Sequence, residues 1–437
     1  MIRVFLTALF FVVLFRPGIV AAVPDTLYYD LPGRQIRGIG ALHDSLPDGH
    51  WVYFFANGGK ESEGWYQKGQ PMGLWKYWYS DGTLMLEKNQ LNGPCRLYHE
   101  NGKLKAEWNV KEGKREGLFR EYDTSGVLRQ EYVYQNGLRE GLGRTFHPNG
   151  KPAFEGMYKH DSLNGKAVWY RPDGSREMEG ELLNDLQHGY WVFYHAGGKK
   201  GSEGRFVMGK RTGKWTFYYE TSEKWKEGQY ENDKRQGHWT VYYESGQKLQ
   251  EGDFKDDLEE GLWVNFYDNG QVDYQGNFIA GQMDGLWQGW YDNGRRRYEH
   301  NYSQGQAEGR WTYYYSNGRL KYDGFYKAGQ RNGVWTEYYP TGNPESKVSY
   351  VNGKKSGPAW FYDPAGVLIR QQGFKNDLPD GPFVSYDQTG MKESEGAYLD
   401  GQMHGIWKYY TAQGRVKYAV EYNRGKKVRV LHDERKK

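Results

Sequence analysis

The chain has 437 residues, of which 37% are hydrophobic and 17% aromatic, and its formal net charge is +4. This small net charge argues against a nucleic-acid-binding protein, because neutralising phosphates with excess Lys and Arg supplies most of the affinity for DNA or RNA. The single cysteine, Cys95, excludes an intrachain disulfide framework and a cysteine-based metal cluster.

Residues 1–22 have the features of a secretory signal peptide. Arg3 precedes an apolar run from Val4 to Phe15, and Val20 and Ala22 fit the small-residue pattern of a cleavage site. This run is too short to span a bilayer comfortably. We therefore expect cleavage after Ala22 and a mature protein that is secreted or held in the periplasm or cell envelope. An uncleaved anchor is the alternative.

A tandem repeat fills residues 49–428. A glycine recurs at Gly49, Gly73 and Gly93 and then every 24 residues to Gly405, so it marks sixteen repeats, of which only the second is short. With this glycine as position 1, position 3 is Trp in ten repeats, position 6 is aromatic in all sixteen, and position 18 is aromatic in thirteen. Residues 23–48 are then an N-terminal cap, and residues 429–437 are a basic C-terminal tail.

Each repeat is predicted to be one β-hairpin. Asn-Gly or Asp-Gly at positions 9 and 10, as in Asn269-Gly270, lies between aromatic and β-branched residues. That pattern favours a two-residue type I′ turn, in which both central residues have positive φ. Cross-strand partners would then have positions that sum to nineteen, so that Trp at position 3 faces Gly at position 16 and its indole covers that glycine.

A lone hairpin is marginally stable in water, so the repeats must pack side by side. The sequence therefore predicts an all-β fold: an elongated, single-layer, twisted antiparallel sheet of stacked β-hairpin repeats, similar to a solenoid. Positions 3, 7, 14, 16 and 18 would share one face. The aromatic residue at position 6 would share the other face with positions 13 and 15, as in Tyr314, Lys321 and Asp323.

These motifs resemble the variant form of the MORN repeat. The resemblance rests on strings such as Gly309-Arg-Trp-Thr-Tyr-Tyr-Tyr-Ser-Asn-Gly318 and Asp323-Gly-Phe-Tyr-Lys-Ala-Gly329, and it covers nearly all of the mature chain. It implies consecutive antiparallel hairpins with an aromatic-lined groove used mainly for protein–protein scaffolding. Six repeats have another residue in place of the tryptophan, which would interrupt a surface built on position 3: Cys95, Phe119, Gly143, Ala167, Ala359 and Phe383.

The polar residues favour structure over catalysis. His99, His147 and His195 share position 7, where Tyr is usual, and are interpreted as surface aromatics instead of metal ligands. Glu recurs at position 15, and a carboxylate repeated along the chain favours a solvated face or a salt-bridge ladder over an active site. We therefore expect a non-enzymatic protein without a cofactor or a bound metal.

The candidate binding surface is the aromatic stripe between Trp191 and Tyr339. The residues proposed to contact a partner are Trp191, Trp215, Trp239, Trp263, Trp287, Trp311, Trp335, Tyr219, Tyr243, Tyr267, Tyr291 and Tyr315. We expect an extracytoplasmic scaffold for protein partners, with no nucleic acid and only weak or indirect membrane association.

The alternative is a module that binds a cell-wall or other envelope glycan through aromatic cages. The Gly-x-Trp-x-x-Tyr-Tyr string also resembles choline-binding cell-wall repeats, although the 24-residue period is longer than theirs.

Overall fold

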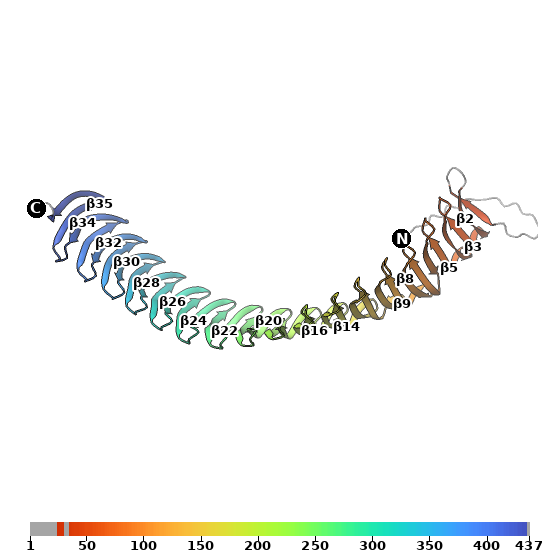
Figure 1. Cartoon of the computed structure of the whole chain (residues 1–437), viewed down its shortest axis with the longest axis horizontal. Helices are drawn as coiled ribbons and strands as arrows, with labels where there is room; N and C mark the ends of the chain where they lie inside the picture. Colours follow the sequence, from red (N-terminus) through yellow and green to blue (C-terminus); the bar gives the residue numbers. More distant parts are fainter. Residues whose placement is uncertain (1–23, 30–34, 435–437) are drawn as a thin grey trace, which may run out of the picture. The chain divides into compact units, whose positions relative to one another are not determined.

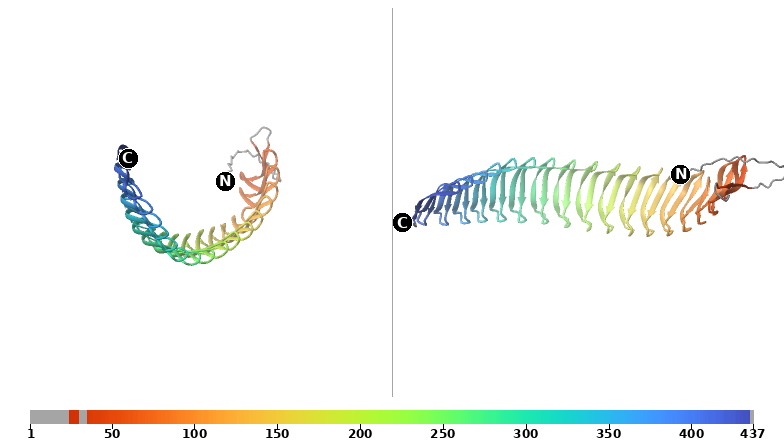
Figure 2. Two further views of the ribbon diagram at one scale, coloured as in Figure 1. Left: turned by 60° about the vertical axis from the view of Figure 1, so that its left-hand side comes forward. Right: turned by 90° about the horizontal axis from the view of Figure 1, so that it is seen from above.

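A computed structural model describes residues 24–29 and 35–434. The chain divides into an N-terminal half, residues 1–198, and a C-terminal half, residues 199–437. Each half is a single layer of antiparallel strands in chain order (Figures 1 and 2). The predicted all-β fold of stacked hairpins is therefore confirmed.

The N-terminal half contains β1 (Asp25–Tyr28), β2 (Ile36–His43), β3 (Leu46–Phe54), β4 (Lys60–Gln67), β5 (Gln70–Trp78), β6 (Leu84–Asn89), β7 (Gly93–Tyr98), β8 (Leu104–Lys111), β9 (Lys114–Tyr122), β10 (Leu128–Gln135), β11 (Leu138–Arg139), β12 (Gly141–Phe146), β13 (Pro152–Lys159), β14 (Ser162–Tyr170), β15 (Arg176–Leu183) and β16 (Leu186–Tyr194). The strands pair in chain order, except that β11 and β12 both pair with β10.

The C-terminal half contains β17 (Lys200–Val207), β18 (Lys210–Tyr218), β19 (Lys224–Glu231), β20 (Lys234–Tyr242), β21 (Lys248–Lys255), β22 (Leu258–Phe266), β23 (Val272–Ile279), β24 (Gln282–Trp290), β25 (Arg296–Ser303), β26 (Gln306–Tyr314), β27 (Leu320–Lys327), β28 (Gln330–Tyr338), β29 (Pro344–Val351), β30 (Lys354–Tyr362), β31 (Leu368–Lys375), β32 (Leu378–Tyr386), β33 (Lys392–Leu399), β34 (Gln402–Tyr410), β35 (Val416–Asn423) and β36 (Lys426–Asp433). These strands also pair in chain order.

The predicted register is confirmed along most of each hairpin. Trp215 on β18 pairs with Gly228 on β19, which are positions 3 and 16 of one repeat. Alternation along these strands places positions 3, 5, 7, 14, 16, 18 and 23 on one face, which we call the aromatic face. Positions 2, 4, 6, 12, 15, 17, 19 and 22 lie on the opposite face, which we call the ion-pair face.

The predicted turn type at positions 9 and 10 is wrong. Tyr267 donates its N–H to the Gln271 carbonyl at 2.8 Å, and Gly270 donates to the Tyr267 carbonyl at 2.9 Å. Of Asn269 and Gly270, only Gly270 has positive φ, 83°. The tip is therefore a three-residue loop, a type I turn that ends in a left-handed glycine and a bulge. This bulge carries position 13 to the aromatic face, where the Lys321 ammonium lies 5.6 Å from the Tyr313 ring.

The type I′ turns lie instead at the junctions between repeats. Val351 pairs with Lys354, and the two residues between them, Asn352 and Gly353, have φ of 48° and 78°. Positive φ at both central residues defines this turn, whose twist matches that of the strands it joins. Each strand therefore belongs to two hairpins, one closed at the tip and one at the junction.

The indole covers a different glycine from the one predicted. Gln229 pairs with Gln236 and Glu227 pairs with Thr240, so three residues, from Gly237 to Trp239, oppose Gly228 alone. Gly237 has φ of 59°, which glycine adopts without strain. The extra residues carry Trp239 over Gly228 of the preceding repeat, although its register partner is Gly252 of its own repeat.

Antiparallel pairing extends beyond residues 49–428 at both ends. β2 lies within residues 23–48 and β3 begins there, and both continue the same antiparallel pairing. The boundary placed at residue 429 falls inside β36, which extends to Asp433. The predicted signal peptide lies outside the described residues.

Candidate interaction surface

The aromatic face is built on the tryptophans of position 3. Trp239 is only 4% exposed, and its indole N–H donates to the Gln229 carbonyl at 3.1 Å. A Cβ added to Gly228 would lie 2.1 Å from the indole. The indole therefore fills the space that glycine leaves, and its only polar atom is satisfied by the neighbouring strand.

The same arrangement recurs at every tryptophan of position 3. All ten indoles donate to the carbonyl ten residues earlier, at 2.9–3.2 Å. Nine of them are buried: Trp51, Trp75, Trp191, Trp215, Trp239, Trp263, Trp287, Trp335 and Trp407. Trp311 is half-buried because His300, which replaces the glycine before it, stacks on its ring at 3.8 Å. Six of the seven tryptophans proposed to contact a partner are thus buried in the sheet, and Trp311 is half-buried. Trp263 and Trp287 are among the six buried ones.

The five tyrosines proposed as binding residues secure the hairpin tips. Tyr219, Tyr243, Tyr267, Tyr291 and Tyr315 are half-buried. Each donates its hydroxyl to the backbone carbonyl of position 6 in the next repeat, at 2.7–2.9 Å. His99 and His147 bond the same carbonyl through Nε2 at 3.0 and 2.8 Å. These two histidines therefore replace tyrosine as structural aromatics.

The ion-pair face has a polar side next to the hairpin tips. Glu395 accepts a hydrogen bond from the Tyr410 hydroxyl at 2.6 Å and pairs with Lys392 at 2.9 Å and Lys408 at 3.2 Å. These contacts lower the pKa of Glu395 to about 2. Glu63, Glu203, Glu227 and Glu251 also pair with a lysine three residues earlier. The salt-bridge ladder expected at position 15 is present.

The other side of this face, next to the junction turns, carries many exposed apolar side chains, although exposed lysines such as Lys210, Lys214 and Lys234 stand there between Val207 and Leu258. Large apolar side chains recur there at positions 2, 17, 19 and 22, and we call them the apolar band. In the N-terminal half the band comprises Leu46, Trp65, Leu74, Leu118, Val133, Leu138, Met157, Leu183, Leu186 and Tyr190. In the C-terminal half it comprises Val207, Leu258, Leu262, Ile279, Leu286, Phe325, Val334, Val351, Leu378 and Ile406.

The exposure of the band is high for such residues, from 37% for Leu118 to 58% for Trp65. Rows of exposed apolar side chains mark contact surfaces in soluble proteins. Sequence reasoning missed this surface because it followed the largest aromatic residues. The recurrence of Leu, Val or Ile at position 2 was the signal that could have revealed it.

Within the described ranges, no helix is long and apolar enough to cross a membrane. Among the same residues, His, Cys, Asp and Glu form no group of three or more that could hold a metal ion.

Known structures give only weak matches. The chain is 11% identical to a chain in the crystal structure of TcdB2-TccC3, covering 92% of this chain and 24% of that one, with a TM-score of 0.15. A chain from the Photorhabdus luminescens Tc holotoxin pore matches at 10% identity, with coverages of 92% and 30% and a TM-score of 0.12. The chain thus spans less than a third of these proteins. No curated protein matches the sequence.

The model of one sequence family matches nine segments, described as the MORN repeat variant: residues 91–112, 115–136, 139–160, 211–232, 235–256, 259–280, 283–304, 307–328 and 331–352. Each segment begins at or just after one junction turn and ends in the following junction turn. One family unit therefore corresponds to one hairpin closed at its tip. The strands outside these segments continue the same pairing within each half. This chain belongs to the MORN repeat variant family.

Proposed function

We propose that this protein is an extracytoplasmic, non-enzymatic scaffold that binds protein partners along the apolar band. The family supports a repeat protein that binds other molecules. The observation that carries the proposal is the row of exposed apolar side chains on the ion-pair face, such as Leu262, Leu286 and Val334. The aromatic groove expected from the sequence is less suitable, because its indoles already pack inside the sheet.

The chemistry of the band fits a protein surface. Protein interfaces combine an apolar centre with a polar rim, and the salt-bridge ladder runs beside the band on the same face. Contacts spread over many repeats accumulate affinity without a deep pocket. The leader-like residues 1–22 support a location outside the cytoplasm.

Capture of partners from envelope extracts on purified residues 23–437 tests the scaffold. The key variant is Leu262→Lys with Leu286→Lys, which places two charges in the band. Its matched control is Ser202→Lys with Gln250→Lys, which adds the same charges at position 14 of the aromatic face, where Lys226 stands naturally.

We expect the band variant to lose captured proteins while the control retains them. Both variants should have the circular dichroism spectrum of the natural protein. Treating the extract with protease should abolish capture, whereas glycosidase should not. Equal capture by the two variants would place binding elsewhere. Mass spectrometry of the expressed protein, with Val23 as the expected first residue, tests the location.

A further inference from the structure

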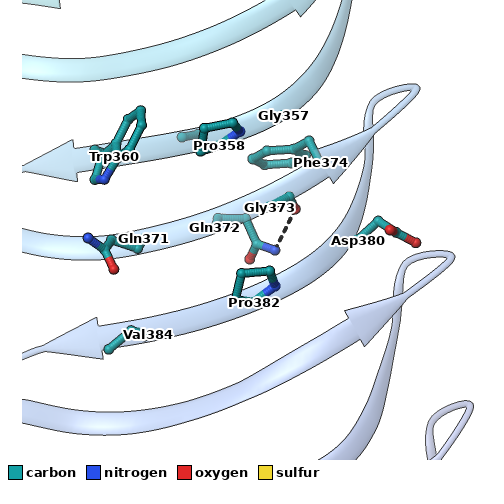
Figure 3. A pocket seen from close by; sticks show the side chains of 11 residues that line it. Gly357, Pro358, Trp360, Gln371, Gln372, Gly373, Phe374, Asp380, Pro382 and Val384 are labelled. Carbon is teal, nitrogen blue, oxygen red and sulfur yellow. Dashed lines mark hydrogen bonds between the residues drawn. The ribbon is translucent and has the colours of Figure 1, made fainter.

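A hollow of about 400 Å³ opens in the C-terminal half where β30, β31 and β32 lie side by side (Figure 3). Its lining includes Pro358 and Trp360 on β30, Gln371 and Gly373 on β31, and Pro382 on β32. This volume is within the range of small-ligand sites, roughly 300–1,000 Å³.

The hollow exists because one repeat has a glycine at position 17. Pro358 pairs directly with Gly373, and on the other side Pro382 is the last of three β32 residues that oppose Gly373 in a bulge. A Cβ at Gly373 would lie 2.2 Å from the Asp380 carbonyl oxygen, so a side chain cannot be added without moving backbone. The floor therefore stays open between two proline rings (Figure 3).

Two residues in the walls of the hollow differ from those usual at their repeat positions. Trp360 occupies position 4, which is Thr in four other repeats of this half: Thr216, Thr240, Thr312 and Thr336. Gln371 occupies position 15, the usual place of the ladder glutamate, and pairs across the strands with both Trp360 and Val384. The ion-pair ladder is thus replaced by an indole and a neutral amide at one place.

Hydrogen-bonding groups remain at the rim. The Tyr386 hydroxyl donates to Gln371 Oε1 at 3.4 Å, which aims the amide oxygen at the protein and leaves the amide N–H groups to donate to a ligand. Asp380 borders the hollow at the end away from Trp360, and its carboxylate points outward and accepts the Asp400 backbone N–H at 3.1 Å (Figure 3).

The charge of the lining selects among ligand classes. It contains no Lys or Arg, so a phosphate or carboxylate ligand would find no cation. Lys347, the cross-strand partner of Trp360 on β29, is not part of the lining. A purely apolar ligand would leave the Gln371 amide N–H groups without an acceptor, which costs binding energy.

A sugar ring has an apolar C–H face that suits the Trp360 indole and hydroxyl groups that suit the Gln371 amide. We propose that this hollow binds a neutral pyranose residue of a glycan. Trp360 packs against the apolar face of the ring, while the Gln371 amide donates to its hydroxyls. This site lies apart from the exposed leucines tested above and does not depend on the scaffold function.

Four neutral probes test the site in the full mature chain: cellotriose, chitotriose, xylotriose and maltotriose, measured by saturation-transfer NMR and calorimetry. Trp360→Thr and Gln371→Glu each restore the residue usual in other repeats, so both variants should fold. Trp65→Ala, which removes a more exposed indole from the same face of the N-terminal half, is the matched control.

We expect at least one probe to bind at millimolar concentration, Trp360→Thr to weaken it about tenfold or more, and Trp65→Ala to leave it unchanged. Gln371→Glu should reduce affinity because it removes the amide donors. Failure of all four probes, or equal affinity in Trp360→Thr, overturns the proposal. Binding of decaproline alone, lost in Trp360→Thr, would assign the hollow to a proline-rich peptide and also overturn it.

Discussion

Replacing Gly228 with alanine tests how the core is packed. The new methyl carbon would lie 2.1 Å from the Trp239 ring, and Gly228 does not have the positive φ that would by itself disfavour alanine. Overpacking of a core costs about 1–3 kcal/mol, and the displaced indole loses its hydrogen bond to Gln229, worth about 0.5–1.5 kcal/mol. We expect a local loss of about 2–4 kcal/mol.

Stability in a repeat array is local, so hydrogen exchange measures it better than one melting temperature. Amides of β19 and β20 should exchange faster in Gly228→Ala, and those of β33 and β34 should not change. Gly197→Ala is the control, because a Cβ there meets no atom within 4 Å and needs no positive φ. Equal protection in the two variants would refute the packing argument.

A double substitution sharpens the test. Val348 and Ala359 occupy the positions of Gly228 and Trp239 in another repeat, and both are buried, 5% and 1% exposed. Trp239→Ala alone should cost about 3–5 kcal/mol because it leaves a cavity. Gly228→Val combined with Trp239→Ala should cost less than the sum of the single substitutions, since the valine fills that cavity. Additive costs would show that the two side chains do not share one space.

Three further substitutions probe the turns and the ladder. Tyr243→Phe removes the 2.9 Å hydrogen bond to the Phe266 carbonyl and should cost about 0.5–1.5 kcal/mol, seen as faster exchange at the tips of these two repeats. Ser222→Gly should stabilise its tip by about 1 kcal/mol, because Ser222 has φ of 86° where most repeats have glycine; slower local exchange is the readout. Glu395 has its pKa lowered to about 2 from the usual 4.5, so its contribution is complete above pH 4.5 and is lost as the pH falls toward 2. Glu395→Gln should therefore destabilise β33 and β34 at neutral pH, and its difference from the natural protein should shrink in acid.

The period and the register were predictable because they depend on few facts. A recurring glycine fixes the length of the repeat, and the pairing of Trp215 with Gly228 follows from counting outward from the tip. The count survives the wrong turn type because the bulge affects only the pairs next to the loop. Tyr218 pairs with Lys224, one residue short of the predicted partner, while the inner pairs keep their register.

The turn types were not predictable from dipeptides alone. Asn269-Gly270 at a tip and Asn352-Gly353 at a junction have the same sequence, yet the asparagine has positive φ only at the junction. What differs is the number of residues between the last paired positions, which depends on how both neighbouring strands align. The bulge at Gly237 arises in the same way, and it decides which glycine an indole covers.

The tryptophans were proposed as contact residues because of their size, whereas the structure buries nine of the ten at position 3. In a single-layer sheet each indole can still be buried, by glycine on the adjacent strand beneath it and by aromatic rings around it. The ring centroid of Trp239 lies 5.1 Å from that of Tyr230 and 6.1 Å from that of Phe254. The aliphatic residues of the opposite face were overlooked because each is small, although many of them are exposed.

The repeats that lack tryptophan do not interrupt this core. In nine cases a glycine at position 16 precedes a tryptophan at position 3 of the next repeat, as with Gly228 and Trp239. Where a larger residue replaces the glycine, a smaller one usually replaces the tryptophan: Trp108 precedes Phe119, and Val348 precedes Ala359. His300 with Trp311 breaks this exchange, and there the indole is only half-buried. Because these substitutions are compensated within adjacent strands, they preserve packing on the aromatic face. On the ion-pair face position 6 is aromatic in every repeat, whereas the exposed positions 2, 17, 19 and 22 lie outside this packing and differ from repeat to repeat.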